Sequence, residues 1–122
     1  MIRMTTLDGR FAVCRLSPDA PLPSWPRGAF VSITRTPDEL SIVCDESSVP
    51  DDVRAERDWR ALRVEGPIPF EVTGVAAGIC APLAAAGISV FLVATFDTDY
   101  LLVKADAYGR AVEALRASGI DV

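Results

Sequence analysis

A repeat at a spacing of 60 residues constrains the fold of this chain more than any other feature of its sequence. The segment AFVSITRTPDELSIVCDE (29–46) aligns without a gap to SVFLVATFDTDYLLVKAD (89–106). In each copy, two β-rich runs flank a short polar turn, which is the pattern of a β-hairpin. The alignment predicts two related units in a chain of 122 residues, with a chance match between two amphipathic hairpins as the alternative.

The second half alternates between strand and helix patterns. An alanine-rich helix is expected over 75–87, with Gly87 as its stop signal. A second helix is expected to follow Asp106 as its cap and to end at Gly119, a left-handed C-cap before Ile120. Strands are expected at 60–66, 68–72, 88–96 and 100–105. This is the β-α-β-β-α-(β) order of a ferredoxin-like unit, an antiparallel sheet with its helices on one face.

The first half keeps the strands but not the helices. We expect strands over 9–16, 29–36 and 40–46, with a proline-rich segment at 17–28 that forbids a helix of any length. The charged segment 49–59 is expected to be mostly loop. The predicted fold class is therefore α+β, with a degenerate ferredoxin-like unit at 1–60 and a complete one at 61–122.

The charge balance argues against two classes of partner. The net charge is −5, and 12 Lys and Arg are scattered among 17 Asp and Glu. Proteins that bind nucleic acid or anionic membranes carry a basic surplus or stripe, so neither partner is expected. The chain also shows no apolar run of membrane-spanning length and no secretory signal, which leads us to expect a cytoplasmic protein.

The content of histidine and cysteine narrows the chemistry further. The chain has no histidine, which excludes a Ser-His-Asp triad, a Cys-His dyad and His-ligated zinc. Cys14, Cys44 and Cys80 form no C-x-x-C pair and each lies in an apolar stretch, so we expect reduced, mostly buried thiols. No metal, cofactor or catalytic residue is expected.

The run TGVAAGICAPLAAAGISVFLVATFDTDYLLVK (73–104) resembles the ACT domain family. It is most similar to small tandem-ACT proteins related to the ACT repeats of the arginine sensor CASTOR, and more distantly to the regulatory domains of aspartate kinases. The resemblance covers 60–122 well and rests mainly on the repeat over the first half. It implies a regulatory module that binds an amino acid or similar metabolite, forms a homodimer edge to edge, and signals to a regulated protein partner.

The start of the predicted helix offers an anion site. Helix N-termini carry about half a positive charge and unpaired N–H groups, and here these lie at Val75 and Ala76, after Thr73 and Gly74. A glycine lets a ligand approach the backbone closely. The alternative is that Thr73 serves only as the helix N-cap.

The turn of the second hairpin offers opposite charge. Asp97 and Asp99, on either side of Thr98, are able to pair with an ammonium group, although a plain hydrophilic turn is the alternative. A metal site is a third interpretation, but no further ligands lie nearby in the sequence. The family resemblance places this turn beside the ligand pocket, which adds Thr95 and Phe96 to the expected ligand-binding residues.

Three classes of function remain after these steps. The first is a regulatory module that binds a small molecule, and it needs only backbone donors and a few carboxylates. The second is an enzyme that works through Asp97 and Asp99 alone, which the missing histidine, phosphate loop and metal cluster disfavour. The third is a protein-interaction or structural ACT domain that has lost ligand binding. We expect the first, without catalytic activity.

Overall fold

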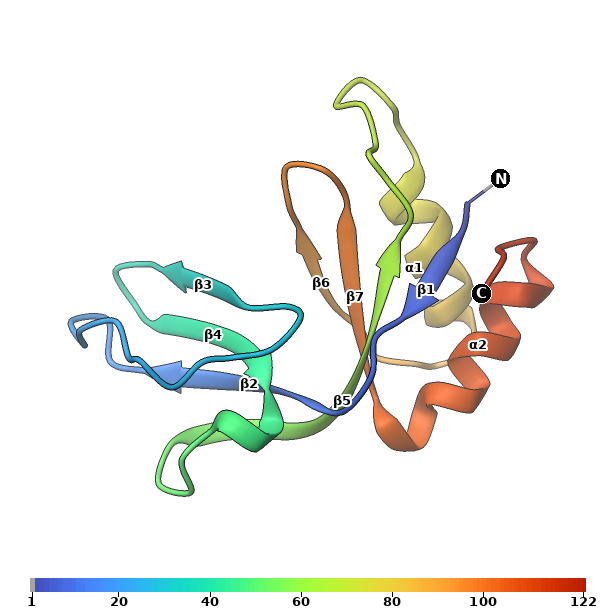
Figure 1. Ribbon diagram of the computed structural model, residues 1–122. Coiled ribbons are helices and arrows are strands. Elements are labelled where there is room, and N and C mark those ends of the chain that lie inside the picture. Colours follow the sequence, from blue (N-terminus) through green and yellow to red (C-terminus); the bar gives the residue numbers. More distant parts are fainter. Residues whose placement is uncertain (1) are drawn as a thin grey trace. The chain divides into compact units, whose positions relative to one another are not determined.

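The computed structural model describes residues 2–122 and has a mixed α+β fold with antiparallel strands and two α-helices in that range (Figure 1). Its contacts divide it into a C-terminal unit, residues 2–8 and 60–122, and an N-terminal unit, residues 9–59. The elements in chain order are β1 (Met4–Thr6), β2 (Phe11–Leu16), β3 (Ser32–Arg35), β4 (Leu40–Asp45), the 3₁₀ turn η1 (Glu46–Ser48), β5 (Arg54–Val64), α1 (Val75–Ala85), β6 (Phe91–Ala94), β7 (Asp99–Lys104), the 3₁₀ turn η2 (Ala105–Ala107) and α2 (Tyr108–Ala117).

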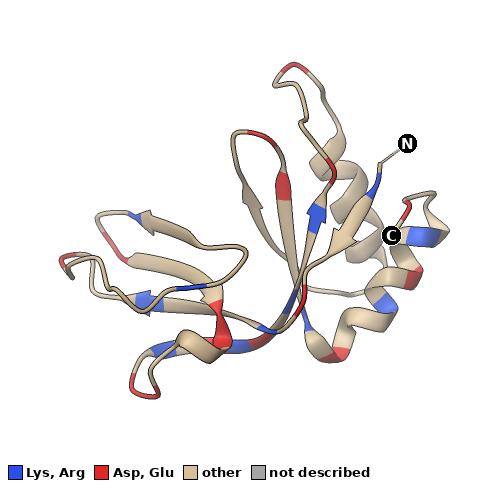
Figure 2. Cartoon of the chain, in the orientation of Figure 1, with Lys and Arg blue, Asp and Glu red and all other residues tan. Residues whose placement is uncertain are grey.

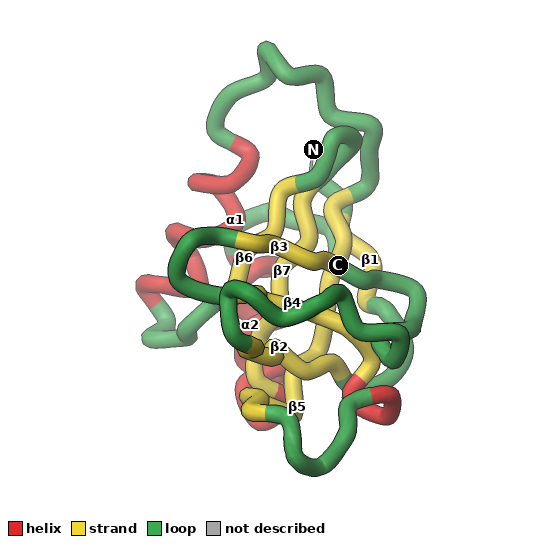
Figure 3. Tube along the Cα trace, turned by 90° about the vertical axis from the view of Figure 1, so that its left-hand side faces the viewer, coloured by secondary structure: helices red, strands yellow, loops and turns green. Residues whose placement is uncertain are grey.

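The C-terminal unit packs two helices on one face of a sheet with the strand order β1-β5-β7-β6 (Figure 3). Its core joins the inward side chains of the strands to one face of each helix. The fully buried members include Leu62, Ile79, Leu83, Leu101 and Leu115. Burying a side chain of this size stabilises the fold by about 1.5–3 kcal/mol, so helices and sheet depend on each other.

Both helices end as their glycines predict. Gly87 and Gly119 have positive φ angles of 73° and 94°, which a residue with a side chain rarely adopts. The next residue in each case, Ile88 or Ile120, is buried and donates its N–H back to a carbonyl five residues earlier. The starts differ from expectation, because Asp106 lies in η2 and the N-cap of α2 is Ala107, without a side-chain cap bond.

The N-terminal unit has the strand order β3-β4-β2-β5, to which β5 contributes its first residues. No α-helix lies among its residues, and the proline-rich segment is instead held by Arg35, whose guanidinium donates to the carbonyls of Pro18 and Ala20. A small apolar core lies around Leu40 and Ile42. This matches the prediction of a first half that keeps strands and lacks helices.

All three cysteines are free, as predicted, but their burial differs. Cys14 and Cys44 are buried, while Cys80 in α1 is only half-buried. Cys14 lies in the same apolar core as Cys44. A hydrogen bond with the Cys44 side chain, together with burial, raises the pKa of Cys14 far above that of an ordinary thiol.

The elements of the two hairpins follow one another at a constant spacing, but this spacing is 59 residues and the predicted value of 60 is wrong. The counterparts Ser32 and Phe91, Leu40 and Asp99, and Glu46 and Ala105 begin equivalent elements at a spacing of 59. A slip of one residue exchanges the two faces of a strand. The sequence alignment therefore matched side chains on one face of the first hairpin with side chains on the opposite face of the second.

Two other segments also differ from their predictions. Residues 68–72, expected as a strand, form a loop with a turn, in keeping with the prolines at 67 and 69. Residues 54–59, expected as loop, belong to β5, and their exposure alternates along the chain as in a half-buried strand. In the described part of the chain, no helix is long and apolar enough to cross a membrane.

Candidate functional site

The C-terminal unit contains a pocket of about 300 Å³ between the loop before α1, the first turn of α1 and the turn that joins β6 to β7. Eight of the nine residues singled out in the sequence line it, and Thr73 does not. The lining residues are Ile68, Pro69, Phe70, Val72, Gly74, Val75, Ala76, Ala94, Thr95, Phe96, Asp97, Thr98 and Asp99. The fold thus brings together two segments that are about 20 residues apart in the sequence.

The first turn of α1 contributes backbone donors. Its N-cap is Gly74, with φ 83°, and no side-chain cap bond is made, so the interpretation of Thr73 as the cap is wrong. The helical hydrogen bonds begin with the N–H of Gly78, which donates to the Gly74 carbonyl at 2.8 Å. The N–H groups of Val75 and Ala76, both in the pocket lining, therefore have no acceptor within the helix.

The β6–β7 turn presents two kinds of side chain. Thr95 and Thr98 hold the turn itself: Thr95 Oγ1 donates to the Thr98 carbonyl at 2.9 Å, and Thr98 Oγ1 donates to the Val64 carbonyl at 2.6 Å. Thr98 is only 7% exposed. The carboxylates of Asp97 and Asp99 are exposed and half-buried, respectively. The two threonines therefore stabilise the turn itself.

The loop before α1 is anchored to this turn. The N–H of Ile68 donates to the Asp97 carbonyl at 2.7 Å. Gly66 packs so closely that a Cβ there would lie 3.0 Å from the same carbonyl oxygen. The loop supplies apolar lining that the sequence did not reveal, because residues 68–72 were interpreted as a strand. The prolines on either side of Ile68 were the available signal for a loop.

Two phenylalanines mark the outer wall of the pocket. Phe70 and Phe96 are 74% and 79% exposed, and their rings meet edge to face with centroids 4.9 Å apart. Phe70 comes from the loop and Phe96 from the turn, so the pair connects the two segments a second time. Side chains of this size are usually buried, which makes their exposure here informative.

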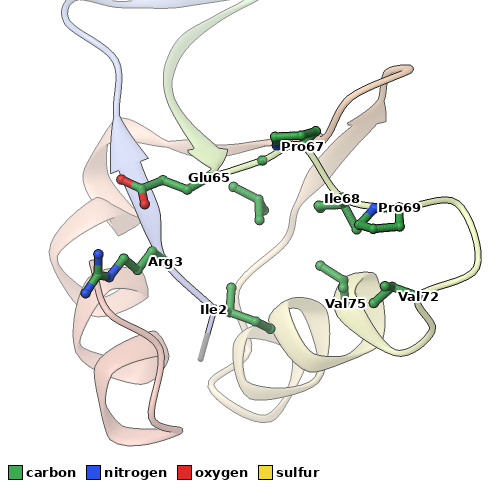
Figure 4. Close-up of a pocket in the computed structure, with 10 residues that line it drawn as sticks. Ile2, Arg3, Glu65, Pro67, Ile68, Pro69, Val72 and Val75 are labelled. Atoms are coloured by element: carbon green, nitrogen blue, oxygen red, sulfur yellow. The ribbon is translucent and has the colours of Figure 1, made fainter.

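A second pocket, of about 560 Å³, lies on the other side of the same loop. Figure 4 shows the charged ends of Arg3 and Glu65 at one side of it and Ile68, Val72 and Val75 at the other. Arg3 is already paired with Asp121, at 3.2 Å between exposed side chains. The two pockets share Ile68, Pro69, Val72 and Val75, so the loop forms a common wall.

Known protein families match both parts of the chain. The family model described as the ACT domain matches residues 54–117, from the first residue of β5 to the last of α2. The chain belongs to the ACT domain family. A second family model, of an N-terminal domain, matches residues 9–52, which all lie in the N-terminal unit. The resemblance drawn from the FDTDYLLVK turn and the helix before it is confirmed.

Curated relatives of this ACT protein carry the name cytosolic arginine sensor for mTORC1 subunit 1. The Bos taurus protein is 34% identical over 96 residues, which cover 72% of this chain and 29% of the relative. The Homo sapiens protein is 42% identical over 59 residues, which cover 48% of this chain and 18% of the relative. The chain thus spans less than a third of the length of these relatives.

Solved structures share the fold over nearly the whole ACT protein. A crystal structure of an Agobacterium tumefaciens protein is 40% identical, with a TM-score of 0.93, and the match covers 98% of this chain and 90% of that one. The regulatory subunit of aspartate kinase from Thermus thermophilus has a TM-score of 0.64 at 13% identity, covering 93% and 94% of the two chains. At that identity the second likeness shows the fold alone.

Proposed function

We propose that this protein is a regulatory module that binds an amino acid or similar metabolite in the pocket between α1 and the β6–β7 turn, without catalytic activity. The observation that carries the proposal is the meeting of unpaired helix N–H groups with two carboxylates in one cavity. Membership of the ACT family and the arginine sensors among the relatives support it. The identity of the amino acid is left to experiment.

A free amino acid suits this arrangement because it carries both charges. Its carboxylate accepts hydrogen bonds from the N–H groups of Val75 or Ala76, where the helix dipole favours negative charge. Its ammonium group pairs with Asp99, with Asp97 as the alternative partner. Ile68 and Val72 add apolar lining beside these charged contacts.

Several further properties belong to the proposal. The chain is a tandem of two ACT-like ferredoxin units, a degenerate one predicted over 1–60 and a ligand-binding one over 61–122, although residues 2–8 pack with the C-terminal unit. It acts in the cytoplasm, and the name of its relatives describes them as cytosolic. It forms a homodimer that pairs through sheet edges. It passes ligand occupancy on to a protein partner. The separation of the chain into two compact units and the similar hairpin in each unit support the tandem. The terminal strand β6 of the sheet supplies an edge through which two copies are able to pair.

A thermal-shift screen of the twenty amino acids with the full chain tests the proposal. A ligand that binds only the folded state raises the melting temperature, and at a hundred times its Kd it adds about 2.7 kcal/mol of stability. The proposal expects at least one amino acid to do so without being turned over. If none stabilises the chain, the pocket is not an amino-acid site and the protein-interaction alternative gains support.

Variants of the two carboxylates then locate the ligand. Removing one member of a buried charge pair costs about 2–5 kcal/mol, so Asp99→Ala should weaken binding at least tenfold by calorimetry. Glu113→Ala, at an exposed position of α2, is the matched control and should bind like the parent. If Asp99→Ala and Asp97→Ala both stay within twofold of the parent, the ammonium group binds elsewhere.

A further inference from the structure

An exposed patch at the mouth of the pocket has features of a protein interface. It consists of Phe70, Val72 and Phe96, which we call the aromatic patch, and all three side chains are exposed. Aromatic side chains in exposed apolar patches dominate the energetics of many interfaces, because they bury a large area at little cost in conformational entropy. The edge-to-face contact between Phe70 and Phe96 fixes the rings in place before any partner arrives.

The two chain segments that carry the aromatic patch bear acidic side chains only, and Arg3, which lines the second pocket together with Val72, is paired with Asp121. From residue 64 to residue 103 the chain carries Glu65, Glu71, Asp97 and Asp99, and no Lys or Arg. In Figure 2 the loop before α1 and the β6–β7 turn both show acidic residues and no basic ones. A surface with an apolar centre and an acidic rim is complementary to an apolar segment that carries basic side chains.

We propose that the aromatic patch docks a segment of a partner protein in which apolar residues alternate with Lys or Arg. A second copy of this chain fits less well, because a two-fold contact would place the patch against itself and acid against acid. The acidic rim likewise disfavours nucleic acid and anionic lipid.

The patch also connects docking to ligand binding. Phe70 and Phe96 line the pocket, and the rim carboxylates Asp97 and Asp99 are the proposed partners of the ligand ammonium. The ammonium group of a bound amino acid occupies Asp99 or Asp97, which the basic segment would otherwise contact, so the two should oppose each other. This coupling rests on the proposed function, whereas the docking surface does not.

Fluorescence anisotropy of short labelled peptides against the full chain tests the docking surface. The probe is a fluorescein-labelled peptide of alternating leucine and arginine, compared with leucine–glutamate and glycine–arginine peptides of equal length. We expect the first to bind, the second not to bind, and the third to bind at least tenfold more weakly. If the glycine–arginine peptide binds as tightly as the leucine–arginine peptide, charge alone explains the attraction and the proposal is overturned. The proposal is also overturned if the leucine–arginine peptide does not bind.

Substitutions locate the site of docking. Phe96→Ala and Phe70→Ala should each weaken the leucine–arginine peptide at least tenfold, and Glu71→Gln should weaken it less and reduce its salt dependence. Leu22→Ala and Glu113→Gln, an exposed apolar and an exposed acidic position elsewhere, should leave binding unchanged. Melting temperatures establish that each variant is folded. Amide NMR shifts of the parent should change around residues 70–72 and 96 on adding peptide, and shifts confined to other residues contradict the proposal.

Competition separates this inference from the proposed function. An amino acid that stabilises the chain in the thermal screen should weaken the peptide several-fold at saturation. If no amino acid stabilises the chain but the peptide binds and depends on Phe96, the proposed function fails and the docking surface stands. If an amino acid binds and the peptide does not, the docking surface is wrong and the proposed function stands.

Discussion

The two hairpin turns of this protein are built alike and are surrounded differently. In the N-terminal unit, the N–H of Thr36 donates to the Glu39 carbonyl at 2.9 Å, and in the C-terminal unit Thr95 donates to Thr98 at 2.8 Å. In both turns the threonine hydroxyl also bonds to the backbone three residues on. The hydrogen bonds of the turn are therefore common to both units, and the pocket comes from what is packed against the second turn.

The contrast is clearest at the carbonyl in the middle of each turn. The carbonyl of Asp38 accepts a hydrogen bond from Arg15 Nη2 at 2.8 Å, whereas that of Asp97 accepts one from the N–H of Ile68 at 2.7 Å. A side chain covers the first turn, and a backbone loop that leads into α1 covers the second. The hairpin is thus common to both units, and at the second turn a loop and a helix N-terminus complete a pocket.

The residue after each turn has diverged most. Leu40 is fully buried in the core of the N-terminal unit, and its counterpart Asp99 is half-buried at the pocket. A carboxylate at a position where the related hairpin uses a core leucine gives up apolar burial. This agrees with a role for Asp99 in binding.

Exchanging these two counterparts should give the largest effect. Leu40→Asp places an unpaired charge in an apolar core and should cost more than about 4 kcal/mol, enough to unfold the N-terminal unit. Urea unfolding followed by circular dichroism measures this loss. Asp99→Leu should leave the free energy of unfolding unchanged or slightly higher while abolishing ligand binding. Similar losses of stability in both variants would mean that Asp99 is structural, and the comparison would fail.

The hydrogen bond that ties the second turn to β5 should give the next largest effect. Thr98→Val keeps the shape of the side chain but leaves the buried Val64 carbonyl without this donor, which costs about 1–3 kcal/mol. The counterpart change Glu39→Gln, at the less buried position of the first turn, should shift the free energy of unfolding by less than about 0.5 kcal/mol. Equal losses in the two variants would remove this difference between the turns.

The sequence predicted the parts of this molecule that local signals specify. The hairpins, both helices and their glycine C-caps follow from periodicity and turn chemistry over a few residues. Eight of the nine residues singled out in the sequence line one pocket, because helix N-termini and acidic turns have recognisable sequences, and their role in binding a ligand stays a prediction. The ACT family itself was recognised from the FDTDYLLVK turn and the preceding helix.

Features that depend on packing between distant segments were missed. The register of the repeat was wrong by one residue because both faces of β4 and β7 are largely apolar, so hydrophobicity alone does not distinguish the faces. The strand residues 54–59 were interpreted as a loop because many of them are charged, although their exposure alternates along the chain as in a strand. Phe70 was placed in a strand, because the contact that fixes its loop, from Ile68 to Asp97, joins residues far apart in the chain.

Raising the pH above 9 should affect the N-terminal unit through the Cys14–Cys44 pair, in which Cys14 keeps its proton and its hydrogen bond lowers the pKa of Cys44 to about 6. The folded pKa of Cys14 lies far above 9.0, the ordinary thiol value expected in the unfolded chain, so above pH 9 only the unfolded chain releases this proton. Proton release stabilises the unfolded state, and stability from this group should fall by about 1.4 kcal/mol for each pH unit above 9. Urea unfolding from pH 9 to 10 should show this fall in the parent relative to Cys14→Ala, because below pH 9 the lowered pKa of Cys44 makes stability rise with pH. Parallel curves for the two proteins would contradict the prediction.

The smallest effect should come from the side chain that covers the first turn. Arg15→Ala removes the hydrogen bond to the Asp38 carbonyl, but both residues are exposed and water replaces the donor. The free energy of unfolding should therefore fall by no more than about 0.5 kcal/mol. Urea unfolding of this variant beside Arg15→Lys, which keeps the charge, measures the contribution of the guanidinium. A fall in the free energy of unfolding above about 1.5 kcal/mol would contradict this prediction. Arg15 would then stabilise the first turn as strongly as the loop before α1 stabilises the second.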